Sequence, residues 1–168
     1  MTAVAAPEAE VAAMLEAMAA AAARDGRAGA GIAAVNGPSS VVISGDAGAV
    51  QRVADTFAER GVRVRALHVS HAFHSHRMDP VLAELGQAAQ GLEYRRPGIA
   101  WAGALTGELV AEPDWSYWVR QVREPVRYAD AVTALAAEGV SVFIEIGPDG
   151  TLSALGAGVA DQATFIPV

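Results

Sequence analysis

All four histidines of the chain lie between residues 68 and 76, in the segment "HVSHAFHSH". An imidazole can ligate a metal, transfer a proton near neutral pH or lie in solvent without a chemical role. His68, His71, His74 and His76 do not share one face of a helix, and the segment holds no carboxylate that would complete a zinc site, so we expect no metal. Two interpretations stay open on these residues alone: an exposed histidine-rich loop, or a loop that carries one general base.

A general base acts in covalent catalysis only beside a nucleophile, and the sequence offers no clear one. It contains no cysteine and no G-x-S-x-G motif, the turn that presents a nucleophilic serine above a sheet. Ser39 and Ser40 follow Asn-Gly-Pro and suit a turn. Ser44, Ser70 and Ser75 also lie outside such a motif. Because a base alone forms no covalent acyl-enzyme, the nucleophile is missing from the predicted site.

The composition excludes several classes of protein. The chain has 168 residues, 52% of them hydrophobic, which suffices for one domain or two small subdomains with a packed core. The net charge is −7 and no Lys/Arg run is present, so we expect no nucleic-acid partner. The absence of cysteine excludes disulfides and fits a reducing cytoplasm. The apolar stretch 11–23 is too short to cross a bilayer, and the N-terminus lacks the basic region of a signal peptide, so we expect a cytoplasmic protein without a membrane partner.

The first part of the chain predicts strands and helices in the ferredoxin-like order. "MTAVAA" suits a strand, and Pro7 suits the first position of a helix, with Arg24 and Gly26 as its expected stop. "GIAAVNGPSSVVISG" has two apolar runs around a turn, as a hairpin requires. Asp46 is placed to cap a second helix, and "VRVRALHV" alternates with the period of a half-exposed strand. The order over residues 2–69 is therefore β-α-β-β-α-β.

The second part predicts helices that alternate with apolar strands. A helical stripe follows Asp79, and "DWSYWVRQVREPVRYADAVTALAAEG" gives two helices divided at Pro125, because proline disfavours helix in the residue before it. "GIAWAG" and "VSVFIEIG" are typical of strands buried on both faces, "TLSALGAGV" predicts a last helix, and "FIPV" a last strand. This alternation indicates part of an α/β layer. Its strands are few, so we expect an exposed apolar surface on residues 99–168.

The segment "VSHAFHSHRMDPVLAEL" resembles the region around the catalytic histidine in acyltransferase domains of modular type I polyketide synthases. The segments "IAAVNGPSSVVISGD", "LTGELV", "YWVRQVREPVR" and "FIEIGPDGTLSAL" resemble that family in the same order. The resemblance implies transfer of a malonyl-type unit from malonyl-CoA, through an acyl-serine, to the phosphopantetheine arm of an acyl carrier protein, with no permanently bound cofactor. It also implies a ferredoxin-like subdomain, residues 1–69, followed by the distal part of an α/β-hydrolase-like core, residues 70–168.

The resemblance assigns roles to residues of the histidine segment. His74, the second histidine of "HAFH", matches the general base, and Gln121 matches the residue whose main-chain carbonyl orients that imidazole. His71 and Phe73 fall in the specificity motif, and "HAFH" is similar to the malonyl-selective form. Phe73 would occupy the space that an α-methyl group needs. His68 and His76 are interpreted as solvated or structural.

The chain departs from the family pattern where the nucleophile should be. The family's elbow serine, its carboxylate-binding arginine and its oxyanion donor have no counterpart here, so the chain resembles the C-terminal half of an acyltransferase and is expected to be inactive alone. Three hypotheses follow: an inactive acyltransferase fragment, the complementing half of a split enzyme, or a docking module for the carrier protein. The expected partners are the carrier protein, malonyl-CoA, the missing N-terminal half and the flanking synthase domains.

Overall fold

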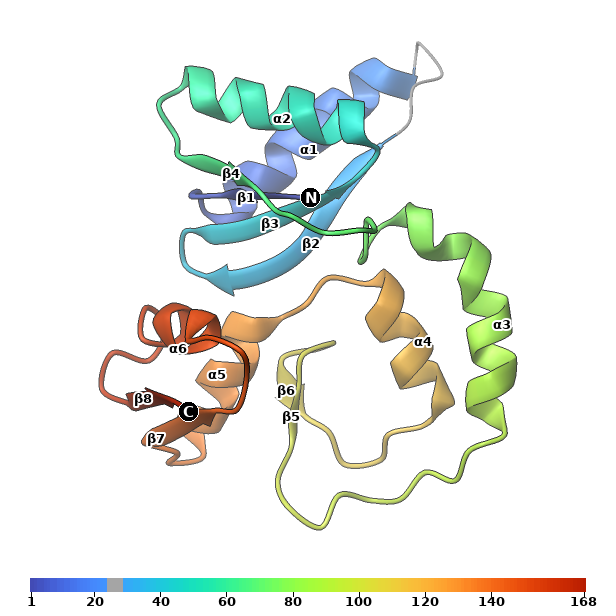
Figure 1. Ribbon diagram of the computed structural model, residues 1–168, viewed down its shortest axis with the longest axis vertical. Helices are drawn as coiled ribbons and strands as arrows, with labels where there is room; N and C mark the ends of the chain where they lie inside the picture. The colour runs from blue at the N-terminus through green and yellow to red at the C-terminus, as the bar shows by residue number, and fades with distance from the viewer. Residues whose placement is uncertain (24–28) are drawn as a thin grey trace.

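The computed structural model describes residues 1–23 and 29–168, which form two parts arranged one above the other (Figure 1). The upper part holds the four-stranded sheet and the first two helices. The lower part holds the remaining helices and two short sheets. The mixed α/β class predicted from the sequence is confirmed. No helix within the described ranges combines the length and the apolar character needed to cross a membrane.

The upper part has the predicted ferredoxin-like order. Its elements are β1 (Thr2–Val4), α1 (Glu8–Ala23), β2 (Ala30–Gly37), β3 (Ser40–Gly45), α2 (Ala47–Glu59) and β4 (Val64–Ala66). The strand order is β2-β3-β1-β4, and every neighbouring pair is antiparallel. Pro7 directly precedes α1, as predicted, whereas the expected stop at Arg24 and Gly26 lies outside the described residues.

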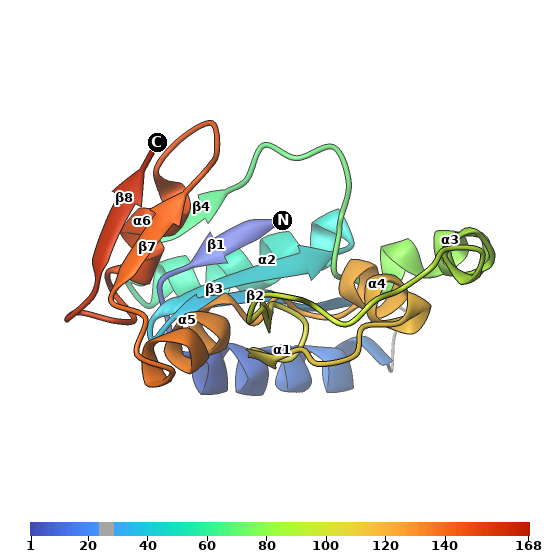
Figure 2. The same cartoon turned by 90° about the horizontal axis from the view of Figure 1, so that it is seen from below.

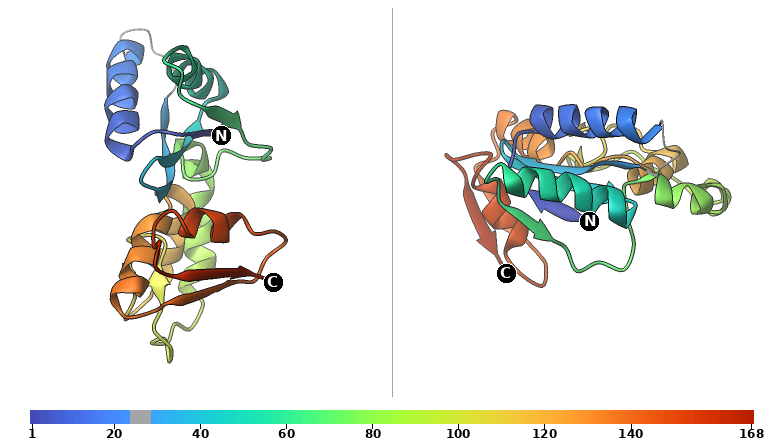
Figure 3. Two further views of the ribbon diagram at one scale, coloured as in Figure 1. Left: turned by 90° about the vertical axis from the view of Figure 1, so that its left-hand side faces the viewer. Right: turned by 90° about the horizontal axis from the view of Figure 1, so that it is seen from above.

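The core of the upper part lies between the sheet and its two helices. Figure 3 shows α1 and α2 lying together over the sheet when the molecule is seen from above. Val4, Val41 and Ile43 of the strands pack with Val11 of α1 and with Phe57 of α2. Burial of β-branched and aromatic side chains removes apolar surface from water and stabilises this arrangement. The predicted apolar faces of the strands and of α2 therefore meet in one cluster.

The strand β3 ends at a glycine for a steric reason. Gly45 has φ +146, a conformation that side chains disfavour, and a Cβ there would overlap the carbonyl oxygen of Gly29. The chain turns directly from this residue into α2, so the close approach brings Asp46 to the end of the sheet.

The lower part follows the predicted alternation. Its elements are the 3₁₀ turn η1 (His76–Met78), α3 (Asp79–Gln90), β5 (Ala102–Gly103), β6 (Glu108–Leu109), α4 (Trp115–Arg123), α5 (Tyr128–Ala137), β7 (Val142–Glu145), α6 (Thr151–Gly156) and β8 (Thr164–Pro167). The division between α4 and α5 at Pro125 is confirmed. Figure 2 shows α3 and α4 at one end of the molecule, with β7, α6 and β8 at the other.

Burial of the lower strands differs from the prediction. The segment "GIAWAG" forms only the two-residue β5, paired with β6, and Ile99 before it is exposed. β7 pairs in parallel with β8, yet Val142 and Ile144 are also exposed. A strand is buried on both faces only where other layers cover it. Within the described residues nothing buries the face of β7 that carries Val142 and Ile144, which confirms the expected exposed apolar surface on residues 99–168.

We expect the isolated chain to self-associate through this surface. Ile146 is 89% exposed beside exposed Ile144, and burial of one isoleucine side chain contributes about 1.5–3 kcal/mol. Ile146→Lys should therefore weaken self-association by about tenfold or more, measured by sedimentation velocity over a range of concentrations. Val81→Lys, which adds the same charge at an exposed position of α3, is the control. A wild-type chain that stays monomeric at every concentration would contradict this expectation.

Candidate active site around His74

His74 lies on the connection between the two parts of the molecule, after β4 and two residues before η1. Its φ is +57, and it is the single non-glycine residue with positive φ in the described ranges. A non-glycine residue in this region costs about 1–3 kcal/mol and is found mostly where surrounding contacts enforce it, often at active sites. The local backbone therefore marks His74 apart from the other histidines.

Hydrogen bonds on both sides of His74 hold this backbone. Its N–H donates to the carbonyl of Val122, near the end of α4, at 3.1 Å. The next residue, Ser75, is buried; its hydroxyl donates to the carbonyl of Ala72 at 2.6 Å and accepts from the N–H of Arg77 at 3.2 Å. The side chain of Ser75 closes the turn, and the hydrogen bond from His74 to Val122 fixes the turn against α4.

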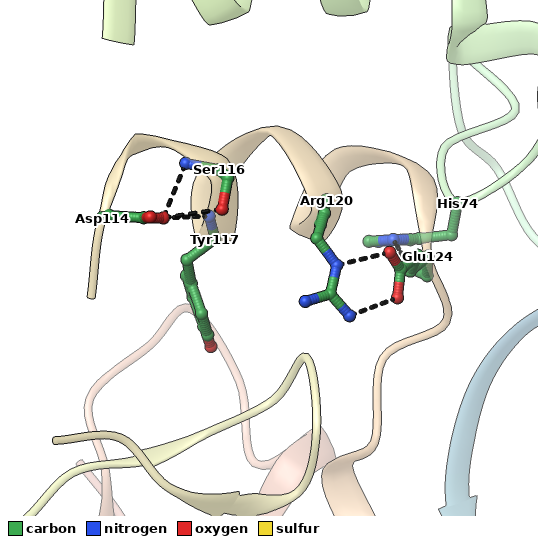
Figure 4. A network of polar contacts seen from close by, with 6 residues as sticks. All are labelled: His74, Asp114, Ser116, Tyr117, Arg120 and Glu124. Carbon is green, nitrogen blue, oxygen red and sulfur yellow. Dashed lines mark hydrogen bonds and ion pairs between the residues drawn. The ribbon is translucent and has the colours of Figure 1, made fainter. Parts of the chain in front are cut away.

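The imidazole of His74 is oriented by a main-chain carbonyl. Nδ1 lies 2.8 Å from the carbonyl oxygen of Glu124, in a half-buried position (Figure 4). Because a carbonyl can only accept, this contact places a proton on Nδ1. In the neutral ring the lone pair is then on Nε2, which forms no hydrogen bond within residues 1–23 and 29–168. The tautomer is the one required of a base that acts through Nε2.

The orienting carbonyl is not the predicted one. Gln121 lies inside α4, where a main-chain carbonyl points along the helix axis. Glu124 follows the helix with ψ 160, so its carbonyl turns away from the axis and toward His74. Pro125 explains this conformation, because a residue before proline is driven out of the helical region. The sequence holds a signal for this difference: Glu124 is followed by Pro125, which indicates that the helix ends before Glu124.

Both ends of α4 are fixed by its own side chains. At the start, Asp114 accepts hydrogen bonds from the hydroxyl of Ser116 and from the N–H groups of Ser116 and Tyr117, which lower the pKa of its carboxyl group. At the end, Arg120 donates two hydrogen bonds to the Glu124 carboxylate, at 2.7 and 3.0 Å, and these hold the pKa of Glu124 below its ordinary value. Figure 4 shows the two networks flanking the helix that carries the contact to His74.

The segment after Glu124 is attached to the upper sheet. The N–H of Val126 donates to the carbonyl of Ala33 at 2.9 Å, and the N–H of Val35 donates to the carbonyl of Val126 at 2.8 Å. The two partners of Val126, Ala33 and Val35, both belong to β2. The carbonyl that contacts His74 is therefore held between α4 and the ferredoxin-like sheet.

The structure brings three of the predicted site residues together. The ring of Phe73 lies edge-on to that of His71, with centroids 5.8 Å apart, and 6.5 Å from the ring of His74. Nδ1 of His71 is 2.9 Å from the hydroxyl of Ser70. His68 is exposed, whereas His76 contacts the carboxylate of Asp46. Within the described part of the chain, no three metal-ligating side chains are grouped so that they could hold an ion.

Comparisons with known proteins place the chain among acyltransferases. Residues 1–165 match the sequence family described as acyl transferase domain. The chain is 47% identical over 168 residues to polyketide synthase GfsB of Streptomyces halstedii, which covers 96% of this chain and 3% of that protein.

Solved structures agree in fold. The acyltransferase domain from the second module of the salinomycin polyketide synthase matches with a TM-score of 0.89 and 42% identity, covering 99% of this chain and 38% of that one. The malonyl-CoA:acyl carrier protein transacylase of Xanthomonas oryzae pv. oryzae matches with a TM-score of 0.83 and 32% identity, covering 99% of this chain and 52% of that one. The 168 residues thus span about half or less of the length of these relatives.

Proposed function

The chain belongs to the acyl transferase domain family, and from this premise we propose that it supplies the general base for transfer of a malonyl unit from malonyl-CoA to an acyl carrier protein. The observation that carries the proposal is the contact between Nδ1 of His74 and the carbonyl of Glu124, which leaves Nε2 able to accept a proton. The left-handed backbone of His74 supports it, because such strain persists mainly where surrounding contacts require it.

The proposed reaction has two proton-balanced halves. In the first, Nε2 of His74 takes the proton of a serine hydroxyl, the serine oxygen attacks the thioester carbonyl of malonyl-CoA, and the departing CoA thiolate takes the proton back from the imidazolium. In the second, Nε2 takes the proton of the phosphopantetheine thiol, the thiolate attacks the acyl-serine, and the released serine oxygen takes that proton back from the imidazolium. The neutral carbonyl of Glu124 fixes the imidazole tautomer, a task that a carboxylate performs in a serine–histidine–aspartate triad.

We propose that the serine is contributed from outside these 168 residues, since they contain no G-x-S-x-G motif. The test is to join this chain to the serine-bearing remainder of the salinomycin second-module domain, in place of the segment that it matches. The joined protein should form acid-stable label from radiolabelled malonyl-CoA and pass it to carrier protein. The 168-residue chain alone should form none. Label on the chain alone would contradict the proposal.

The 168-residue chain, the joined protein and the carrier protein also distinguish the other two hypotheses. If the chain is the complementing half of a split enzyme, mixing it with a separately produced serine-bearing half restores labelling without a covalent link. If it is a docking module, the chain alone binds the carrier protein, and neither mixing nor joining produces label. The family match over residues 1–165 and the geometry of His74 favour a catalytic contribution over a docking role alone.

We further propose that Phe73 selects against substituents on the malonyl α-carbon. Phe73 is 44% exposed, and its ring lies beside those of His71 and His74, next to the proposed base. Phe73→Ser in the joined protein should raise the ratio of methylmalonyl to malonyl transfer by about tenfold, because a methyl-sized contact contributes about 1–3 kcal/mol. Competition between equimolar malonyl-CoA and methylmalonyl-CoA, read by mass spectrometry of the carrier protein, measures the ratio.

The matched control for Phe73→Ser is Val69→Ser, which removes another exposed apolar side chain from the same connection. Val69→Ser should leave the ratio unchanged. An unchanged ratio in Phe73→Ser, with overall transfer retained, would remove Phe73 from the selectivity determinants.

A further inference from the structure

Asp46 occupies a capping position without capping its helix. It is the residue before α2, with the extended backbone typical of an N-cap, yet its side chain makes no capping hydrogen bond. Instead, Oδ1 lies 2.6 Å from Nε of Arg77, and Oδ2 lies 2.9 Å from Nε2 of His76. The sequence predicted a cap at this position. In the structure, the carboxylate instead faces His76 and Arg77, in the turn after His74.

Asp46 is more enclosed than the carboxylate of an ordinary surface ion pair. Its side chain is only 12% exposed, whereas that of Arg77 is 61% exposed. The contact with Arg77 is an ion pair, whereas Oδ2, although 2.9 Å from Nε2 of His76, has no hydrogen-bond partner of good geometry within the described residues. Partial burial of the carboxylate reduces the screening of the Arg77 pair by water and salt. Removal of the carboxylate would leave Arg77 able to return to solvent, so it would not strand a buried charge.

The contacts of Asp46 complete the support of the turn that carries His74. On one side, the carbonyls of Val122 and Glu124 hold the main chain and the ring of His74. On the other side, Asp46 pairs with Arg77 and lies against His76, the two residues that directly follow Ser75. The left-handed backbone at His74 is thereby fixed between α4 of the lower part and the start of α2 in the upper part.

We propose that Asp46 is a positioning residue for His74, acting through His76 and Arg77. The catalytic consequence rests on the proposed function of His74, whereas the structural consequence does not. Asp46 contacts neither the imidazole of His74 nor the ring of Phe73 in this arrangement, so it acts on the geometry of the base. Loss of its charge should loosen the turn and weaken the hydrogen bond from Nδ1 to Glu124.

Asp46→Asn tests the proposal, with Asp55→Asn as the matched control. Asp55 is an exposed carboxylate on the same helix, paired with Gln51, so its replacement removes the same charge without touching the turn. In the 168-residue chain, nitrogen-15 NMR of the histidine side chains should show altered His74 ring signals and faster exchange of its Nδ1 proton in Asp46→Asn only. In the joined protein, kcat should fall by about 10- to 100-fold with little change in KM for malonyl-CoA, because misplacement of a catalytic group by about 1 Å can cost about 100-fold.

The two measurements separate failure of this proposal from failure of the proposed function. His74 signals in Asp46→Asn that match the wild type would overturn the positioning role, even if the joined protein is active. A joined protein without activity would contradict the proposed function, while altered His74 signals would still support positioning. Asp46→Glu, which keeps the charge, should restore part of the kcat lost in Asp46→Asn. A fall in kcat that follows only a loss of folded protein, seen by circular dichroism, would also overturn the role.

Discussion

Replacement of His74 by alanine should lower malonyl transfer in the joined protein by about 10²–10⁴-fold, the usual contribution of a general base. In the proposed mechanism, the substitution removes the group that accepts the serine proton and later the carrier thiol proton. It does not alter the residues that contact His74, which are Val122 near the end of α4 and Glu124 directly after the helix. The architecture around the site should therefore persist. Steady-state transfer to carrier protein, followed by mass spectrometry, measures the loss.

The control for this loss is His68→Ala, which removes an exposed histidine of the same connection. It should retain activity close to the wild type. If His74→Ala retained wild-type activity, the assignment of the base would be wrong. Circular dichroism of both variants distinguishes a catalytic loss from a loss of folded protein.

Phe57→Ala should lower the free energy of unfolding by about 3–5 kcal/mol, the usual cost of truncating a buried phenylalanine. The Phe57 side chain is fully buried between α2 and the sheet, where it packs with Val4 and Ile43. Urea denaturation monitored by circular dichroism measures the change. We propose that residues 1–69 form one unit around this core, so the loss should appear in the transition of that unit.

A second phenylalanine provides the matched control. Phe73 is 44% exposed, and Phe73→Ala should change the free energy of unfolding by about 0.5 kcal/mol or less, as is usual at the surface. Equal destabilisation by the two substitutions would contradict the description of the core.

The ferredoxin-like part could be predicted from sequence because its signals are local. Turn residues at Asn36–Ser40 separate two β-branched runs, and Phe57 lies on a periodic apolar face, so neighbouring segments determine the elements. Burial of β7 could not be predicted in the same way. The apolar run indicated cover on both faces, but cover depends on layers that these described residues do not provide for Val142 and Ile144.

The site could be predicted in part. The histidine segment and its resemblance to a family pointed to His74, and the structure gives that residue a distinctive backbone and an oriented ring. The orienting carbonyl was misassigned to Gln121 because the direction of a carbonyl depends on where the helix ends. Asp46 takes the predicted N-cap position of α2, but its side chain does not form the expected capping bond. The contacts of that side chain could not be predicted, because His76 and Arg77 are distant in the sequence.

Rapid-quench measurement of the two half-reactions in the joined protein tests the central claim most directly. Radiolabelled malonyl-CoA reports formation of the acyl-serine, and addition of carrier protein to the preformed acyl-serine reports its transfer. Since the proposed mechanism assigns both proton transfers to one imidazole, His74→Ala should slow each step by about 10²–10⁴-fold. Half-reactions of His74→Ala that both proceed at the wild-type rate would show that His74 is not the base.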